Sequence, residues 1–366
     1  MPPRTEEYLD WARGKLAELI AIPSETGHEG AILTYLEEEL AAYGFPLARQ
    51  PVVGERYNLL FNPLAAPALL VDVHVDTVAV TLEGVPCRLH QDDYTVYGRG
   101  AVDAKGSVVA VLAALRSFLP QVARTFLPFT VAFTVDEEDA GLGSEALAAA
   151  LRPKAVLVLE PTGLALCPAQ AGSLVVRLNA SGQAVHGSEF EQGRNACQAM
   201  LEALAQLPTL SFLAQAHPLL GQAGYNLRYL RGGTPELVVP QACEAIIDFR
   251  LLPQMELAAV QEEVAAFWRR MGLTGEIVEL APPYALAGDE EVIGLVRSAC
   301  KEVTGEEPAL AGFKSWTDGE NFYAAGVPAV IWGPGQLAVA HTPQERIDLR
   351  EVLTAARVLE AVWRKL

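Results

Sequence analysis

Three short apolar runs in the first half of the chain restrict its fold more than any other feature. They are Ala68–Val73 (ALLVDV), Phe129–Val135 (FTVAFTV) and Ala155–Leu159 (AVLVL). Continuous apolar runs of about four to eight residues are typical of strands that are buried on both faces. Segments with helical spacing separate them, at 107–118 and 144–151. This alternation predicts an α/β domain in which helices cover both faces of a sheet.

The pattern changes after residue 171 and returns after Pro282-Pro283. In between, the predicted order is β-α-β-β-α-β, which is that of a split βαβ, ferredoxin-like α+β domain. We therefore predict a small domain inserted into a larger one: 1–173 and 285–366 form the large α/β domain, and 174–284 form the insertion. The elements expected in the insertion are strands at 174–180, 225–231 and 243–251 and helices at about 194–206 and 255–271.

The composition argues against several classes of protein. Apolar residues make up 51% and charged residues 20% of the 366 residues, which argues against disorder. A net charge of −18 argues against a nucleic-acid partner and mildly favours a cationic small substrate, although a hydrated, solubilising surface is the preferred explanation of the charge. We find no signal peptide and no apolar stretch long enough to cross a membrane. The five scattered cysteines indicate reduced thiols and a cytoplasmic protein.

Polar residues that can bind metal follow the predicted strands. His74 and Asp76 come at the end of the first strand, and residues two apart share a face of an extended chain. His74 would bind a metal and Asp76 would orient its ring, because a metal-bound imidazole commonly has a carboxylate on its other nitrogen. A purely structural His–Asp pair is the alternative.

Three further segments carry acids or histidine at the ends of predicted elements. Asp103 lies in the Gly-rich loop YGRGAVDAKG (97–106), where it could bridge two cations or cap the next helix. In the run Asp136–Asp139, Glu138 could bind metal and Glu137 could act as a free general base, unless the run is a solvated acidic loop. Glu160 and His341 follow the next strands. Two histidines and three carboxylates without cysteine are typical ligands for a pair of zinc ions.

The chain resembles the two-zinc amidohydrolases that include acetylornithine deacetylase, succinyl-diaminopimelate desuccinylase, aminoacylase and glutamate carboxypeptidase. The segments that carry the resemblance are HVDTV, YGRGAVDAKG, DEED, EPT and GPG…HTP, between residues 22 and 347. It implies a three-layer α/β/α zinc-hydrolase domain with a cis peptide bond after Asp103. The implied ligands are His74, Asp103 and Glu160 for one metal and Asp103, Glu138 and His341 for the other, with Glu137 as base and Asp76 as orienter.

The resemblance also gives the inserted domain the role of a lid and dimerisation domain. It implies that His186 reaches an active site, in some relatives that of the partner subunit, and that Arg250 binds a substrate carboxylate. Asn226 and Gly335 would contribute to substrate binding, and Trp316 would form a pocket wall. The alternatives are a structural His186, a surface ion pair for Arg250 and core packing for Trp316. Leu237 stands where many relatives carry Asn, which weakens the case for lid-mediated recognition.

The function expected from this resemblance is hydrolysis of an N-acyl amino acid, of the acetylornithine or acetyl-lysine type, in amino-acid biosynthesis. It would use two Zn²⁺ ions per chain, with Co²⁺ or Mn²⁺ as alternatives, and the chain would be a homodimer. A desuccinylase, or a dipeptidase or carboxypeptidase that cuts short peptides at the same site, is the near alternative. A non-catalytic binder of amino-acid derivatives is the alternative from another class, and Glu137 with five ligand positions argues against it.

Overall fold

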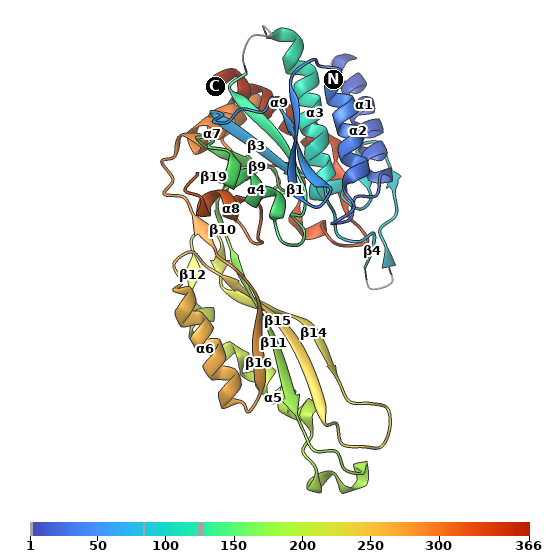
Figure 1. Cartoon of the computed structure of the whole chain (residues 1–366), viewed down its shortest axis with the longest axis vertical. Coiled ribbons are helices and arrows are strands. Elements are labelled where there is room, and N and C mark those ends of the chain that lie inside the picture. Colours follow the sequence, from blue (N-terminus) through green and yellow to red (C-terminus); the bar gives the residue numbers. More distant parts are fainter. Residues whose placement is uncertain (1–2, 83–84, 123–126) are drawn as a thin grey trace. The chain divides into compact units, whose positions relative to one another are not determined.

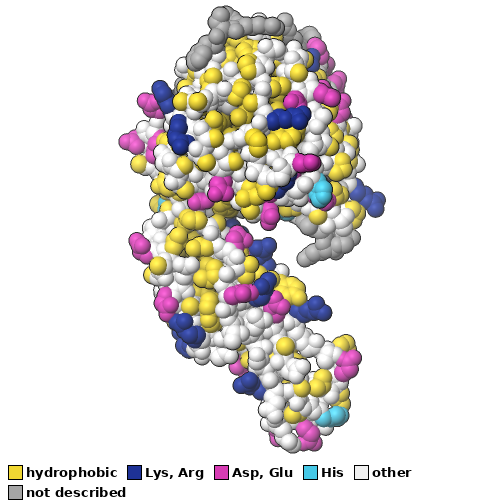
Figure 2. Space-filling view, in the orientation of Figure 1, with side chains coloured by type: hydrophobic (Ala, Val, Ile, Leu, Met, Phe, Trp, Pro, Cys, Tyr) yellow, Lys and Arg dark blue, Asp and Glu magenta, His cyan; other side chains and the backbone are white. Residues whose placement is uncertain are grey.

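The computed structural model describes residues 3–82, 85–122 and 127–366. The chain forms two units. Unit 1 contains Met1–Pro168, Leu286–Ala311 and Thr317–Leu366, and unit 2 contains Ala169–Ala285 and Gly312–Trp316. None of the helices in the described residues is long and apolar enough to cross a membrane. On the face drawn in Figure 2, Asp and Glu side chains are interspersed with Lys and Arg, as on an ordinary hydrated surface.

The sheet of unit 1 combines a parallel centre with antiparallel edges. Its strands follow the order β1-β2-β8-β3-β9-β19-β10, and neighbours among β8, β3, β9 and β19 are parallel. Every residue of β3 and β8 is buried, as their continuous apolar sequences predict. The strands are β1 (Leu47–Val53), β2 (Arg56–Phe61), β3 (Leu69–His74), β8 (Phe129–Thr134), β9 (Val156–Val158), β10 (Leu166–Gln170) and β19 (Ala329–Ile331).

Helices cover both faces of this sheet (Figure 1). Successive strand residues point to opposite faces. Val71, Val73 and Val131 belong to the core that α1, α3, α7 and α9 share. Thr134, on the other face, bonds Asp318, which in turn bonds Ser144 of α4. The helices of unit 1 are α1 (Pro3–Ala21), α2 (Gly30–Ala41), α3 (Gly106–Phe118), α4 (Leu142–Ala150), α7 (Glu291–Thr304), α8 (Gly319–Ala324) and α9 (Leu349–Lys365).

Helix α9 shows how the sequence builds this layer. Asp348 caps it by accepting the backbone N–H of Arg350 at 2.8 Å, which satisfies one of the free donors of the first turn. In its first half the buried residues Leu349, Val352 and Ala356 recur every three or four positions, so one stripe packs into the core, whereas residues 358–363 are all buried. Near its end, Trp363 stacks on Phe129 of β8 with 4.5 Å between ring centroids. Helix and sheet are therefore joined by an aromatic contact at the base of the parallel strands.

Unit 2 has the βαββαβ order and a four-stranded antiparallel sheet, β14-β15-β11-β16. The buried side chains of β11 and β15 form a second core with α5 and α6. Together the two units confirm the predicted combination of a three-layer α/β/α fold with a ferredoxin-like α+β fold. The elements of unit 2 are β11 (Gly172–Ser181), α5 (Ala196–Gln206), β12 (Ala216–His217), β13 (Gly221–Gln222), β14 (Gly224–Gly232), β15 (Ala242–Leu251), α6 (Leu257–Arg270), β16 (Thr274–Ala281) and β17 (Tyr284–Ala285).

Candidate metal centre

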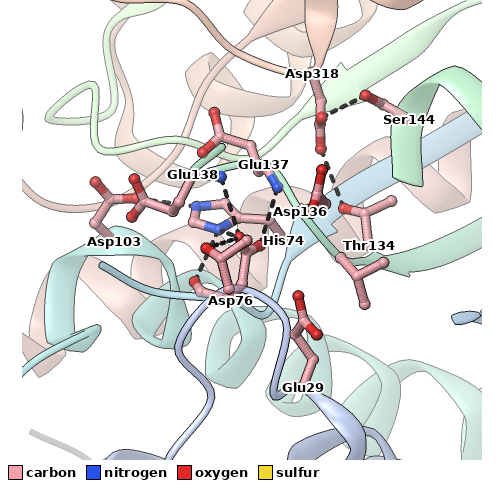
Figure 3. Close-up of polar contacts among 12 residues, drawn as sticks. Glu29, His74, Asp76, Asp103, Thr134, Asp136, Glu137, Glu138, Ser144 and Asp318 are labelled. Atoms are coloured by element: carbon pink, nitrogen blue, oxygen red, sulfur yellow. Dashed lines mark hydrogen bonds and ion pairs between the residues drawn. The ribbon is translucent and has the colours of Figure 1, made fainter. Parts of the chain in front are cut away.

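The parallel strands deliver their polar residues to one edge of the sheet. His74 is the last residue of β3, Glu137 and Glu138 follow β8, and Glu160 follows β9. Because β3 is parallel to both β8 and β9, their carboxyl ends meet at the same edge. Side chains that are far apart in the sequence therefore lie together in unit 1 (Figure 3).

One group of possible ligands surrounds His74. Its Nε2 atom lies 3.0 Å from Oδ1 of Asp103 and 3.8 Å from Oε1 of Glu160. All three residues are buried. Their ligand atoms lie within 4.8 Å of one another, which is close enough for one ion to bind all three.

A second group shares Asp103 with the first. The other oxygen of Asp103, Oδ2, lies 3.3 Å from Nε2 of His341. The same His341 nitrogen lies 3.0 Å from Oε2 of Glu138. Asp103 thus directs one oxygen towards each histidine, which is the arrangement that a ligand bridging two ions requires.

Asp76 contacts both the His74 ring and the backbone of the acidic loop after β8. Its Oδ1 lies 3.5 Å from Nδ1 of His74 and accepts the backbone N–H of Glu137 at 3.1 Å, while Oδ2 accepts that of Glu138, also at 3.1 Å. Thr26 donates a further hydrogen bond to Oδ2 at 2.8 Å. Burial by itself would raise the pKa of Asp76, but the hydrogen bond and the charge of His74 hold it below its usual value. Asp76 therefore stays ionised and can position both the ring and the acidic loop.

Glu137 is 8% exposed and lies beside the ligand groups. Burial, together with the charges of Glu160 and Glu138, raises its pKa well above the usual value, while His74 opposes this rise. A raised pKa suits a general base that must later give its proton away. A carboxylate oxygen of Glu137 also lies within 4.8 Å of possible ligand atoms of His74 and Glu138. The geometry alone therefore permits Glu137 either to bind a metal or to act as the base.

The other two acids of the run 136–139 are not part of the centre. Asp136 adopts a positive φ of 73° and pairs with Arg56 at 2.6 Å, and Arg56 also pairs with Glu29. Asp139 is exposed. Asp136 is therefore explained by its ion pair and Asp139 by its contact with solvent, as is ordinary for acidic runs.

The donor set fits metal ions. Oε1 of Glu160 is buried without a hydrogen-bond partner. Burial, as the largest cause, raises the pKa of both Glu138 and Glu160. Burying several carboxylates together is unfavourable unless cations neutralise them. Imidazole nitrogens and carboxylate oxygens without thiolates are the ligands that zinc, cobalt and manganese accept.

The sequence did not reveal the support of the Asp103 loop. Glu345 accepts the backbone N–H groups of Val102 at 3.2 Å and Asp103 at 3.3 Å, and it forms a buried ion pair with Arg99. The peptide bond between Asp103 and Ala104 is cis, as predicted. A signal for Glu345 was present, since it lies only four residues after His341, but nothing in the sequence shows that it is buried.

A second buried pair of acids, Asp72 and Asp318, was not expected from the sequence. Asp318 accepts hydrogen bonds from Thr134, at 3.2 Å, and from Ser144. Asp72 is fully buried on β3, where burial and then the charge of Asp318 raise its pKa well above the usual value. Asp72 is two residues before His74 and faces the same side of the strand, so period-two spacing could have singled it out.

The predicted lid residues His186, Asn226 and Arg250 belong to unit 2. His186 is exposed, with Nδ1 lying 2.8 Å from the Ser188 hydroxyl. Arg250 pairs with Asp248, which is buried and also accepts a hydrogen bond from Ser173 at 3.0 Å. Asn226 pairs with Asp248 in the β14–β15 register, so it lies on the same face of the sheet.

The last two predicted substrate residues differ in surroundings. Trp316 is partly buried in the segment of unit 2 that precedes α8. Gly335 lies in unit 1 with φ of 88°, and its N–H donates to Glu351 at 2.8 Å. A Cβ atom there would lie 2.3 Å from Val102, so close packing in this loop requires glycine.

Known proteins share both sequence and fold with this chain. The model of the peptidase family M20/M25/M40 matches residues 70–365. A probable carboxypeptidase from Aspergillus terreus is 28% identical over 93% of this chain and 84% of that protein. An acetylornithine deacetylase from Proteus mirabilis is 28% identical over 91% of this chain and 90% of that protein. An M20 family metallo-carboxypeptidase from Sulfolobus solfataricus has the same fold, with a TM-score of 0.78, 20% identity and coverage of 96% of this chain and 98% of that one.

Proposed function

The chain belongs to the peptidase family M20/M25/M40 and is a metal-dependent hydrolase. On this premise, we propose that it removes the acyl group of an N-acyl amino acid of the acetylornithine or acetyl-lysine type. The observation that carries the proposal is the position of Asp103, with one oxygen towards His74 and the other towards His341. The similarity to an acetylornithine deacetylase over nearly the whole chain supports the choice of substrate.

In this proposal the two ligand groups hold two ions, most simply zinc. The first ion would be held by His74, Asp103 and Glu160, and the second by Asp103, Glu138 and His341. When bound, such ions supply an activated water at neutral pH and polarise the amide carbonyl.

Glu137 is the group that moves the proton. It takes a proton from the attacking water as the new C–O bond forms, and it then gives this proton to the leaving nitrogen as the C–N bond breaks. Asp76 keeps the Glu137 backbone in place during both steps through the N–H···Oδ1 hydrogen bond. The products are a free amino acid and a small carboxylate.

A second candidate function is the release of an amino acid from a short peptide. The similarity to the Aspergillus terreus carboxypeptidase favours it, because the identity is again 28% over 93% of this chain. The same centre serves both reactions, since each is the hydrolysis of an amide. The two candidates differ only in what surrounds the scissile bond.

A substrate panel distinguishes them. The metal-loaded chain is assayed for kcat/KM with Nα-acetylornithine, Nα-acetyl-lysine, N-succinyl-diaminopimelate, free dipeptides and N-blocked dipeptides. Deacetylase function predicts the highest kcat/KM for an acetylated basic amino acid. A clear preference for any dipeptide over both acetylated substrates rejects it in favour of the peptidase.

The proposal gives unit 2 the roles of a lid and of a dimer interface. Its edge strand β14 exposes large apolar side chains, among them Tyr225, Leu227 and Leu230, each about two-fifths exposed. Exposed apolar edges of this kind are common where a second chain packs. Light scattering should give twice the chain mass, and a monomer at assay concentration would reject the dimer.

The substrate roles of His186, Asn226, Arg250, Trp316 and Gly335 are part of the same proposal. Arg250 is the sharpest test, because its guanidinium is already oriented by Asp248 and suits bidentate binding of a carboxylate. Arg250→Lys should raise KM about tenfold or more while metal content stays unchanged. An unaltered KM would leave Arg250 with a structural role only.

A further inference from the structure

Two cysteines of unit 2, Cys197 and Cys243, have their sulfur atoms next to Gly232. In the β14–β15 ladder, Gly232 lies directly opposite Cys243. A Cβ atom at Gly232 would lie 2.8 Å from Sγ of Cys243 and 2.7 Å from Sγ of Cys197. Both sulfur atoms therefore occupy the space that a side chain at this position would need, and they are neighbours.

The two thiols come from different elements and have different surroundings. Cys243 is 5% exposed and belongs to the core between β15 and α5. Burial and, after it, the adjacent Cys197 thiol raise the pKa of Cys243 to about 11. Cys197 lies in the first turn of α5, is only partly buried, and packs against the same core. The partly buried thiol is thus the one that a small reagent reaches first.

The position of Cys197 is well defined and accessible. Asn195 caps α5 and accepts the backbone N–H of Cys197 at 2.9 Å, so the first turn is well formed. The thiolate is the reactive form of cysteine, and the partial exposure of Cys197 lets a small reagent reach its sulfur atom. Cys167 and Cys300, by contrast, are buried, and burial raises the pKa of each to about 12.

We propose that Cys197 and Cys243 form a reversible disulfide when the chain encounters a peroxide, and that this pair is a redox modification site separate from the metal centre. The Cys197 thiol releases its proton, and the thiolate attacks one oxygen of hydrogen peroxide. The O–O bond breaks, Cys197 becomes a sulfenic acid, and the other oxygen leaves as hydroxide, which takes up the released proton to form water. The Cys243 sulfur then attacks the Cys197 sulfur, and the S–O bond breaks. The hydroxide leaves with the Cys243 proton as a second water.

The disulfide would further restrain residues 182–196, a segment whose two ends already form backbone hydrogen bonds. Gly182 donates a backbone hydrogen bond to Gln241 at 2.8 Å, and Ala196 donates one to Pro240 at 2.9 Å. The intervening residues include His186. A disulfide one residue beyond Ala196 closes a long loop of chain and restricts the unfolded state, so oxidation should raise the unfolding midpoint of the chain.

The test uses the intact, metal-loaded chain treated with hydrogen peroxide and then denatured without reductant. Peptide mass spectrometry should find the 197 and 243 peptides joined, with two of the five thiols lost and recovered on reduction. The unfolding midpoint should rise by several degrees. Cys300→Ala is the matched control and should behave as the parent chain does.

Two variants make the outcome decisive. In Cys243→Ala, peroxide should drive Cys197 beyond the sulfenic acid to an oxidised form that reduction does not reverse, and the midpoint should not rise. Cys197→Ala should leave Cys243 unmodified at the same dose. The proposal is overturned if the parent chain keeps both thiols free, links them to other cysteines, or over-oxidises Cys197 as readily as Cys243→Ala does.

Discussion

The carboxylate of Asp76 accepts the backbone N–H group of Glu138, with 3.1 Å between Oδ2 and N. Its other oxygen accepts the N–H of Glu137 and faces the His74 ring. A single buried carboxylate therefore sets the position of a proposed ligand on β3 and of the loop after β8. This coupling makes Asp76 the most informative residue outside the proposed ligand set.

Replacing Asp76 should weaken metal binding without removing a ligand. Asp76→Asn keeps the size of the side chain but loses its charge and one acceptor oxygen, so His74 and the acidic loop lose their common support. Outer partners of metal ligands typically contribute about 10- to 100-fold in affinity. Competition with a chromogenic chelator measures the change. Asp139→Asn, on the exposed end of the same loop, is the control, and equal affinities in both variants would contradict this role.

Removing the proposed base should separate turnover from metal binding. Glu137→Gln keeps the shape of the side chain but cannot accept the proton of water, so kcat should fall by about 10²- to 10⁴-fold. Metal content, measured by atomic emission, should stay near that of the parent chain. If the variant instead loses metal and recovers its rate when metal is restored, Glu137 is a ligand and the roles of Glu137 and Glu138 are exchanged.

Chelation should abolish activity, and zinc or cobalt should restore it. The ligand variants should then differ in stoichiometry, because Asp103 belongs to both groups and His341 to one. Asp103→Ala should lower the binding of both ions, whereas His341→Ala should retain close to one ion per chain. Calorimetric titration of the metal-free variants measures this difference. Full activity after verified metal loss would refute the metal mechanism.

The buried pair of Glu345 and Arg99 should matter for stability as well as for the loop. Glu345→Ala leaves Arg99, which is 4% exposed, without its carboxylate, and removing one partner of a buried pair costs about 3–5 kcal/mol. Urea unfolding should show this loss. Glu307→Ala, which breaks the exposed pairs with Arg297 and Lys301, should change the midpoint little. Similar midpoints for both variants would argue against a supporting role of Glu345.

The main strands and helices were predictable because their apolar periodicity is strong. Strand β1 was not, since its sequence LARQPVV mixes polar residues and proline, and β10 is short and also contains proline. In the site, strand-end histidine and acids were recognisable by residue type and position. The partners of Arg99 and Asp72 were not, because Glu345 and Asp318 are more than 200 residues away along the chain and only folding brings them together.

The place of β19 in the sheet has a consequence for the order of events during synthesis. It pairs with β9 on one side and β10 on the other, although about 170 residues of chain separate it from β9 and about 160 from β10. Until the ribosome has made residues 329–331, the sheet of unit 1 lacks the strand that joins β10 to β9, and His341 and α9 emerge later still. Unit 2 is nearly continuous in sequence and can fold first, as domains generally fold as units. A nascent chain released early would therefore carry a folded unit 2 and no complete metal centre.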